Sequence, residues 1–400
     1  MSNSLFLYTS SNIFALTVQL LFQLIAIKEL NETEYGVYSS ALLFSSYILF
    51  FGLGLQTNLA VKISRVGDFK MSDEQVNSTL TYFLLIIIAG FLSILLIHYF
   101  LSKELDRIFL FLILLMAIKG LIIQKFFIVI MRSSKQIKIL SYSQIFIAII
   151  SFIQILLFKH LGLIFIRNLL IVECFVSIFL YSFYSDVTFR LNFTSIKIVL
   201  KDGFNFWKVN FLFSMFPIVV SSFALKSFSL EDFGNFSIFY VSINMFAKLT
   251  SSVDKINYID IAKNYSDLHK VRPIIIFRKN LLHIALLYLL VVIIFLIFGK
   301  TIVMMVLPEK IALVPILLIG ILTSTIGIFN YLNAYYDVIE KFNLKYINII
   351  VKFIVFFLMI LFFNMFEIFS VINLCFIVLF AELMAVLVNL VMIRRVVPIF

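Results

Sequence analysis

Long apolar runs, separated by short polar breaks, follow one another along the whole chain. Runs such as Leu84–Ala89 and Leu289–Ile297 do not alternate between polar and apolar residues, so they favour helices over barrel strands. A helix needs about 20 apolar residues to cross the hydrocarbon of a bilayer. The pattern therefore predicts twelve membrane-spanning helices, at residues 5–27, 36–61, 77–101, 108–131, 139–158, 162–184, 203–225, 234–253, 279–299, 310–333, 346–366 and 370–393.

Composition supports this prediction. Hydrophobic residues make up 63% of the 400 residues and charged residues only 13%, whereas soluble domains have about 45–50% and about 25%. A soluble fold could not bury that much apolar surface. No polar break is long enough for a separate soluble domain, so function is expected among the helices. The first run, from Leu5 to Ile27, is too long for a signal peptide and lacks a basic start, so we predict a first span and not a cleaved signal.

The basic residues predict the orientation. With twelve spans, both termini and every second break lie on one side of the membrane. That side carries nineteen Lys and Arg residues, against eight on the other. The positive-inside rule makes the richer side, with both termini, cytoplasmic. The net charge of +11 is then explained by this topology signal and by attraction of the basic residues to anionic lipid headgroups. A nucleic-acid partner is not needed to explain it.

Residues that could support catalysis or metal binding do not cluster. Cys174 and Cys375 both fall in apolar segments, where thiols act as small hydrophobic groups. The four histidines are scattered, and no phosphate-binding loop, nucleophile elbow or dinucleotide motif occurs. We therefore predict that the protein is not an enzyme and uses no cofactor or metal.

One short motif occurs twice. The copies run from Leu30 to Ser39 and from Phe228 to Ser237, at an offset of 198 residues. Each follows the first span of a six-span half, and each has acidic-type positions, an aromatic residue, a glycine, a second aromatic residue and a serine. We interpret the glycine as permitting a tight turn. The repeat predicts two six-helix bundles in the same orientation, residues 1–200 and 201–400, a plan that transporters use; chance similarity is the alternative.

Several motifs together resemble one family. They are Asn31–Tyr38, Gly52–Leu55, Lys62–Arg65, Lys201–Phe204 leading to Pro217, and Leu307–Ile311. In this order they resemble the polysaccharide flippases of the multidrug/oligosaccharidyl-lipid/polysaccharide (MOP) superfamily, the Wzx-type translocases of O-antigen and capsule repeat units. The chain departs from the family pattern in its minimal loops and in the depth of Pro217 within the seventh span, which puts the position of the hinge in doubt.

The resemblance implies the fold and the cargo. We expect an all-α polytopic membrane protein of the bacterial inner membrane, with two six-helix bundles around a central cavity that opens alternately to each side. The implied cargo is a polyprenyl-diphosphate-linked oligosaccharide. Membrane lipids and polysaccharide polymerase or ligase machinery are the other implied partners.

Charged residues inside the predicted spans indicate a binding site, because each costs at least a few kcal/mol in a membrane. Five are lysines, four of them in the predicted cytoplasmic half. We interpret them as a cationic vestibule for the diphosphate, which lysine binds as a point charge. Snorkelling to the interface is the alternative. The candidate substrate-binding residues are Lys119, Lys125, Lys208, Lys248 and Lys352.

Three further residues are candidates for coupling and motion. Glu173 and Glu382 each lie near the middle of the last span of a half. They could couple transport to protons or cations or act as counter-ions for the lysines; protonated carboxyls bonded to a neighbouring helix are the alternative. Pro217 removes a backbone donor within the seventh span and should kink it. The kink would be either the hinge for alternating access or a static packing feature.

Two other functions stay open at this point. A multidrug or cation antiporter of the same superfamily should favour acidic residues, whereas five lysines and two glutamates lie inside the spans here. A membrane polysaccharide polymerase or ligase should carry a long external loop, which this chain lacks.

Overall fold

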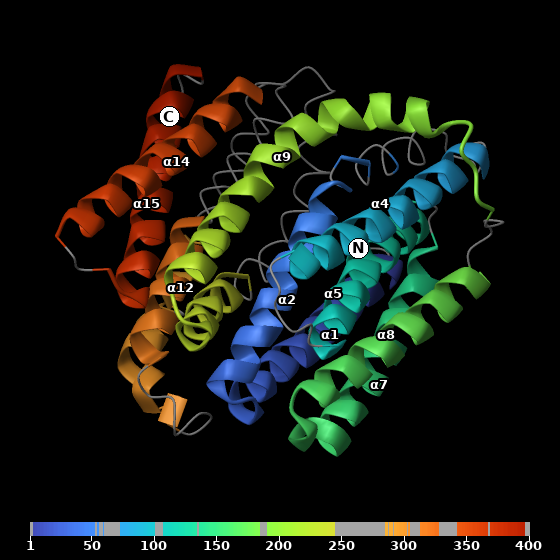
Figure 1. Cartoon of the computed structure of the whole chain (residues 1–400), viewed down its shortest axis with the longest axis horizontal. Helices are drawn as coiled ribbons and strands as arrows, with labels where there is room; N and C mark the ends of the chain where they lie inside the picture. Colours follow the sequence, from blue (N-terminus) through green and yellow to red (C-terminus); the bar gives the residue numbers. More distant parts are fainter. Residues whose placement is uncertain are drawn as a thin grey trace. The chain divides into compact units, whose positions relative to one another are not determined.

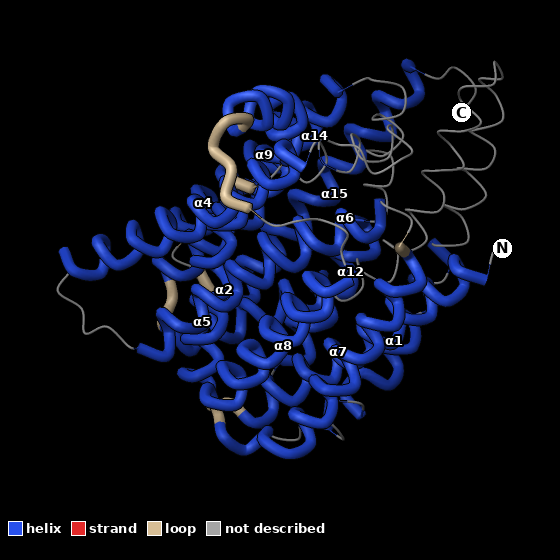
Figure 2. Tube along the Cα trace, turned by 90° about the vertical axis from the view of Figure 1, so that its right-hand side faces the viewer, coloured by secondary structure: helices blue, strands red, loops and turns tan. Residues whose placement is uncertain are grey.

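The computed structural model describes most of the 400 residues: 3–52, 54–55, 59, 73–100, 107–133, 136–184, 190–244, 285–286, 288–290, 292–301, 303–304, 313–327, 342–366 and 369–396. All regular secondary structure within these ranges is helical (Figures 1 and 2). By their contacts the residues form two compact units, Met1–Ser222 and Phe223–Phe400. The division falls inside one long helix, and the boundary predicted at residue 200 stays a prediction.

The first unit is a bundle of long helices. α2 packs on α5, α1 packs on α7, and α8 packs on both α5 and α7. The helix predicted at 108–131 is one continuous rod in which a π-helix separates two α-helical parts. The elements are α1 (Asn3–Glu29), α2 (Glu32–Phe50), α4 (Asp73–Phe100), α5 (Arg107–Ile118), the π-helix η1 (Lys119–Phe127), α6 (Ile128–Ser133), α7 (Ile137–Phe158), the 3₁₀ turn η2 (Lys159–Leu161), α8 (Leu163–Tyr184) and α9 (Ile196–Ser227).

The second unit contains a helix at residues 230–244, helical stretches between 285 and 304, α12 (Val314–Gly327), α14 (Phe342–Met365) and α15 (Val371–Val396). α15 packs on both α14 and α12. Gly320 of α12 lies so close to Ser242 of the 230–244 helix that a Cβ at this position would overlap the serine hydroxyl. The glycine therefore allows these two helices to approach closely.

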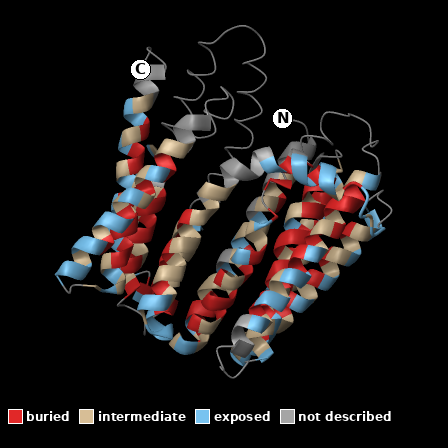
Figure 3. Ribbon diagram, turned by 45° about the horizontal axis from the view of Figure 1, so that its top comes forward, coloured by how far each residue is buried: buried red, intermediate tan, exposed pale blue. Residues whose placement is uncertain are grey.

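Seven helices in the described parts of the chain are long and apolar enough to cross a membrane, namely Ser10–Glu29, Glu74–Leu96, Arg107–Met131, Ile137–Leu161, Leu163–Tyr184, Tyr346–Met365 and Val371–Met392. These helices carry both buried and exposed residues (Figure 3), and large apolar side chains occur among both. On α8, for example, Ile166 is fully buried whereas Phe175 and Phe183 are about 70% exposed. An outer surface of large apolar side chains suits lipid, so the chain is a multi-pass membrane protein.

The repeated motif marks the start of a helix in each unit. Asn31 is the N-cap of α2: its side chain accepts from the Glu34 backbone N–H at 2.7 Å, and the Glu34 carboxylate accepts from the Asn31 N–H. At the offset of 198 residues, the Ser229 hydroxyl accepts from the Asp232 backbone N–H at 3.1 Å. Both copies are therefore N-terminal caps, which satisfy backbone donors that a helix start leaves open.

The interpretation of Gly36 as a turn residue was wrong. Gly36 lies inside α2, buried, and its carbonyl accepts from the Ser40 hydroxyl at 2.8 Å. Its neighbours Tyr35 and Tyr38 are 2% and 3% exposed, and Phe233 and Phe236 at the matching positions are equally buried. The aromatic residues of the motif thus anchor the first turns of each helix in the core, and the helix begins at the cap and not at the glycine.

Candidate functional site

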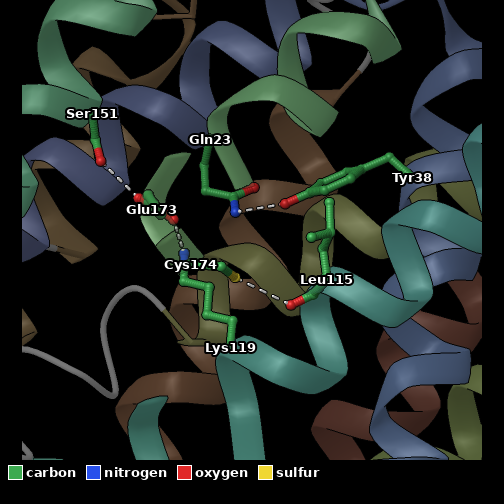
Figure 4. A network of polar contacts seen from close by, with 7 residues as sticks. All are labelled: Gln23, Tyr38, Leu115, Lys119, Ser151, Glu173 and Cys174. Carbon is green, nitrogen blue, oxygen red and sulfur yellow. Dashed lines mark hydrogen bonds and ion pairs between the residues drawn. The ribbon is translucent and has the colours of Figure 1, made fainter. Parts of the chain in front are cut away.

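A buried ion pair joins two helices of the first unit. Lys119, the first residue of η1, pairs with Glu173 in the middle of α8. The other carboxylate oxygen of Glu173 accepts from the Ser151 hydroxyl of α7 at 2.8 Å (Figure 4). The side chains of Lys119 and Glu173 are 30% and 14% exposed. The pair therefore neutralises two charges within the helical core while the lysine stays partly accessible.

Two further polar contacts surround this pair (Figure 4). Gln23 of α1 donates from its amide to the Tyr38 hydroxyl of α2 at 3.2 Å. The thiol of Cys174, next to Glu173, lies 3.6 Å from the Leu115 carbonyl of α5. Elements that lie far apart along the chain thus bring polar groups together around Lys119. We refer to Gln23, Tyr38, Lys119, Ser151 and Glu173 as the amino-terminal polar cluster.

The π-helix η1 gives this part of the rod an unusual geometry. It is nine residues long, begins at Lys119 and contains Lys125. π-helical segments are rare and occur often at functional sites. Gly120, within η1, faces the Leu49 side chain so closely that a Cβ would overlap it. The glycine therefore allows α2 to pack directly against the π-helical segment.

Lys125 contacts the end of α2. Its ammonium donates to the Leu49 backbone carbonyl at 2.6 Å. Leu49 belongs to the last turn of α2, where the helix dipole favours a cation, and its carbonyl also accepts from the Gly52 backbone N–H at 3.1 Å. Lys125 thus caps the carboxyl end of α2, which gives this residue a structural role in addition to the cationic vestibule that the sequence predicted.

The second unit contains a comparable ion pair. Lys352 of α14 donates to Glu382 of α15 at 2.7 Å. Here both side chains are nearly buried, with 7% of Lys352 and 14% of Glu382 exposed. Each of the two predicted intramembrane glutamates therefore lies beside a predicted intramembrane lysine, which is the arrangement that the counter-ion interpretation requires.

The other candidate residues are placed less fully. Lys208 lies on α9, but its side chain is outside the described atoms, and Lys248 lies outside the described residues altogether. Pro217 lies within α9, which continues as helix from Ile196 to Ser227 and is visibly curved in Figure 1. A proline inside a helix removes one backbone hydrogen bond and bends the axis. For Lys208, Lys248 and Pro217, binding and hinge roles therefore stay predictions.

Sequence reasoning did not find Ser151 or the π-helix. Ser151 is one hydroxyl in a long apolar run of α7, and only the packing of α7 on α8 shows that it reaches Glu173. Within the part of the chain that the structure describes, no group of three or more His, Cys, Asp and Glu residues could hold a metal ion. Both cysteines are free and buried.

The comparisons with known proteins show similarity in fold only. No protein-family model and no curated protein sequence matches the chain. Solved structures do match over nearly the whole length. The Vibrio cholerae MATE transporter VcmN, in a mutant form, has a TM-score of 0.69 at 13% identity, covering 99% of this chain and 96% of the transporter.

Two further structures extend this similarity. The lipid II flippase MurJ, in an inward closed conformation, has a TM-score of 0.70 at 14% identity, covering 97% of this chain and 87% of the flippase. A MOP-superfamily transporter from Pyrococcus furiosus has a TM-score of 0.62 at 12% identity, covering 99% and 95%. The fold prediction is thus confirmed: this all-α membrane protein shares the fold of the MATE and MurJ transporters that it matches.

Proposed function

We propose that the protein is a flippase that moves a polyprenyl-diphosphate-linked oligosaccharide repeat unit from the cytoplasmic to the outer leaflet of the bacterial inner membrane. It works by alternating access and does no covalent chemistry. The observation that carries the proposal is the fold shared with a lipid II flippase over 97% of the chain. The motifs from Asn31 to Arg65 and the MATE-like architecture are consistent with the same class of transport.

The charges inside the helices support an anionic cargo. Five lysines and two glutamates lie within the predicted spans, so the excess charge there is positive. A diphosphate carries negative charge and is well matched by lysine ammonium groups. Lys119 is the best placed of those described, because it remains 30% exposed although Glu173 pairs with it. The cargo diphosphate would compete with Glu173 for this ammonium and loosen the ion pair.

A second candidate is a multidrug or cation antiporter. Five of the solved structures that the chain matches over 98–99% of its length are MATE transporters. Such a protein would use Glu173 or Glu382 to bind a proton or cation in place of the lysine that each now contacts. The positive excess inside the spans makes this candidate the weaker one, since cationic drugs would meet lysines.

The decisive experiment deletes the gene in its native bacterium and follows the glycan. Surface polysaccharide is stained, and the polyprenyl-linked oligosaccharide is extracted and assigned to one leaflet of the membrane. We expect surface polysaccharide to disappear and the lipid-linked unit to accumulate on the cytoplasmic side. Single repeat units accumulating on the outer side would indicate a polymerase or ligase. An unchanged surface with altered drug tolerance would indicate the antiporter.

The lysines are tested by complementation of that deletion. Lys119→Ala combined with Lys248→Ala should fail to restore surface polysaccharide although the protein reaches normal abundance. Glu173→Gln is the matched control, because it breaks the same ion pair but leaves the cation for the cargo. We expect Glu173→Gln to retain export. Normal export by the double lysine variant would rule out the cationic site.

A further inference from the structure

The segment that leads into α9 is held firmly against the first unit. Asn77 and Thr81 of α4 accept from the backbone N–H groups of Arg190 and Asn192 at 2.9 and 2.8 Å. One turn earlier, Glu74 accepts from the hydroxyls of Thr194 and Ser195 at 2.5 and 2.8 Å. Residues 190–195 are not helical, yet side chains of α4 satisfy their polar groups. This clamp fixes one face of the segment to the protein and leaves the other face outward.

The first turns of α9 continue this two-sided arrangement. Ser195, Val199 and Gly203 repeat at intervals of four residues and are buried. They form one stripe of the helix, and Gly203 lies directly against Leu55. The stripe therefore packs on the unit, whereas Lys197, Ile198, Leu200 and Lys201, which lie between its members, are exposed.

The outward face combines basic and large apolar side chains. Arg190, Lys197 and Lys201 are exposed. So are Leu191 at 67%, Phe193 at 61% and Ile198 at 51%. Between 190 and 201 the sequence contains three basic residues and no acidic residue, although Asp202 follows directly. The nearby Glu74 carboxylate keeps its charge but is directed toward the hydroxyls of Thr194 and Ser195. The face, which we call the basic-apolar face, is thus complementary to a ligand with an anionic head and an apolar body.

The length of α9 places this face at the level of lipid headgroups. A helix of 32 residues is about 48 Å long, whereas the hydrocarbon core is about 30 Å thick. The strongly apolar part of α9 is its second half, Ser214–Ser227. The first turns therefore extend beyond the hydrocarbon. In Figure 1 they start beside the N-terminal end of α4, before the helix curves downward. The positive-inside count assigns this end to the cytoplasmic side.

We propose that the basic-apolar face, residues 190–201, is a binding surface for anionic phospholipid of the cytoplasmic leaflet. The three basic residues bind the headgroup phosphate, and Leu191, Phe193 and Ile198 enter the boundary between headgroups and acyl chains. Each basic residue near an anionic membrane surface adds to the attraction, and apolar side chains on the same face add burial. The surface is independent of which cargo the protein moves.

The test compares the thermal unfolding of purified full-length protein in detergent with added dioleoyl phosphatidylglycerol or dioleoyl phosphatidylcholine. A ligand that binds only the folded protein raises its midpoint temperature, here by about 2–4 °C near saturation. We expect this rise with phosphatidylglycerol and not with phosphatidylcholine. Inorganic phosphate at the same concentration should give no rise. An equal rise with inorganic phosphate would replace the lipid surface by a simple anion site.

Two triple variants locate the effect. Arg190→Gln, Lys197→Gln and Lys201→Gln together should remove more than half of the rise specific to phosphatidylglycerol. The matched control, Lys28→Gln, Lys226→Gln and Lys300→Gln, removes the same charge from exposed positions on the predicted outer side and should keep it. Equal losses in both triple variants, or none in the first, would overturn the proposal.

Further variants separate binding from folding. Lys197→Gln and Lys201→Gln made singly change only exposed side chains and should each remove part of the rise, even if the triple variant does not fold. Leu191→Ser with Ile198→Ser should also weaken the response to phosphatidylglycerol, because the apolar half of the surface is lost. A full response in all of these variants would contradict the surface.

Discussion

The ion pair between Lys119 and Glu173 makes an asymmetric prediction about stability. The lysine side chain is 30% exposed and the glutamate 14%, and Ser151 also donates to the glutamate. Removing one partner of a buried pair leaves the other charge in an apolar surrounding, which is more damaging than removing both. The two single substitutions, Lys119→Met and Glu173→Gln, should therefore differ, and the double substitution should be milder than the worse of them.

The loss of stability in each single variant depends on how well the charge that remains is stabilised by its other neighbours. In Lys119→Met, the Glu173 carboxylate loses its counter-ion, and breaking a buried ion pair in this way costs about 3–5 kcal/mol. The bond from Ser151 offsets part of this loss, which leaves about 2–3 kcal/mol. In Glu173→Gln, the partly exposed lysine has room to reorient its ammonium, so we expect about 1–2 kcal/mol.

Thermal unfolding of the purified protein measures these losses. Cys174 and Cys375 are free and buried, so a thiol-reactive fluorophore reports unfolding without an introduced cysteine. For a chain of this size 1 kcal/mol corresponds to about 2 °C or less. We expect Lys119→Met to unfold at the lowest temperature, Glu173→Gln at an intermediate one, and the double variant near the unsubstituted protein.

The pair in the second unit is the internal control. Lys352 is only 7% exposed, so its ammonium cannot reach water as easily as that of Lys119. Glu382→Gln should therefore destabilise the protein more than Glu173→Gln, by up to about 5 kcal/mol, the upper value for breaking a buried ion pair. Two results would refute this reasoning. One is the same midpoint temperature for Glu173→Gln and Glu382→Gln. The other is a double variant, Lys119→Met with Glu173→Gln, whose loss of stability equals the sum of the two single losses.

Three further substitutions test local features by the same unfolding measurement. Lys125→Met should destabilise by about 1.5–3 kcal/mol because the Leu49 carbonyl loses a charged donor, and Lys125→Arg should recover part of this; equal midpoints for both would argue against the cap. Asn31→Ala removes the capping box and should destabilise the protein by about 1 kcal/mol. An unchanged midpoint temperature would mean that the Asn31 cap does not stabilise the start of α2. Gly120→Ala should destabilise the protein by about 1–3 kcal/mol, because the new methyl group overlaps Leu49. In a double variant with Leu49→Ala the overlap is gone, so the total loss should be smaller than the sum of the two single losses.

The helices could be predicted from the sequence because the bilayer sets their length. The span expected at 139–158 is α7 at Ile137–Phe158, and the break expected near Lys159 is the 3₁₀ turn η2. The first turns of α9 were not predicted, because the apolar run begins only at residue 203 whereas the helix begins at Ile196. Hydropathy records where a helix enters hydrocarbon and not where its backbone hydrogen bonds begin.

The partners of the intramembrane charges could be predicted only in part. Two glutamates and five lysines were visible as charges in apolar spans, but the sequence does not say that Glu173 meets Lys119, 54 residues away, because the rotation of each helix about its axis is set by packing. The capping function of the repeated motif was readable: Asn31 followed three residues later by Glu34 is a known helix start. Interpreting Gly36 as a turn residue was wrong, because the helix starts five residues earlier, at the Asn31 cap.

Each of the two ion pairs lies wholly within one unit, Lys119 with Glu173 in Met1–Ser222 and Lys352 with Glu382 in Phe223–Phe400. A unit that moves as a rigid body therefore carries its lysine and its glutamate together. Moving one elementary charge through the membrane potential changes the energy by about 2.3 kcal/mol per 100 mV, whereas a neutral pair contributes almost nothing. These four residues would consequently contribute almost nothing to any voltage dependence of the conformational change. A dependence of transport on membrane potential would instead come from the other lysines within the spans, from the cargo or from a coupled ion.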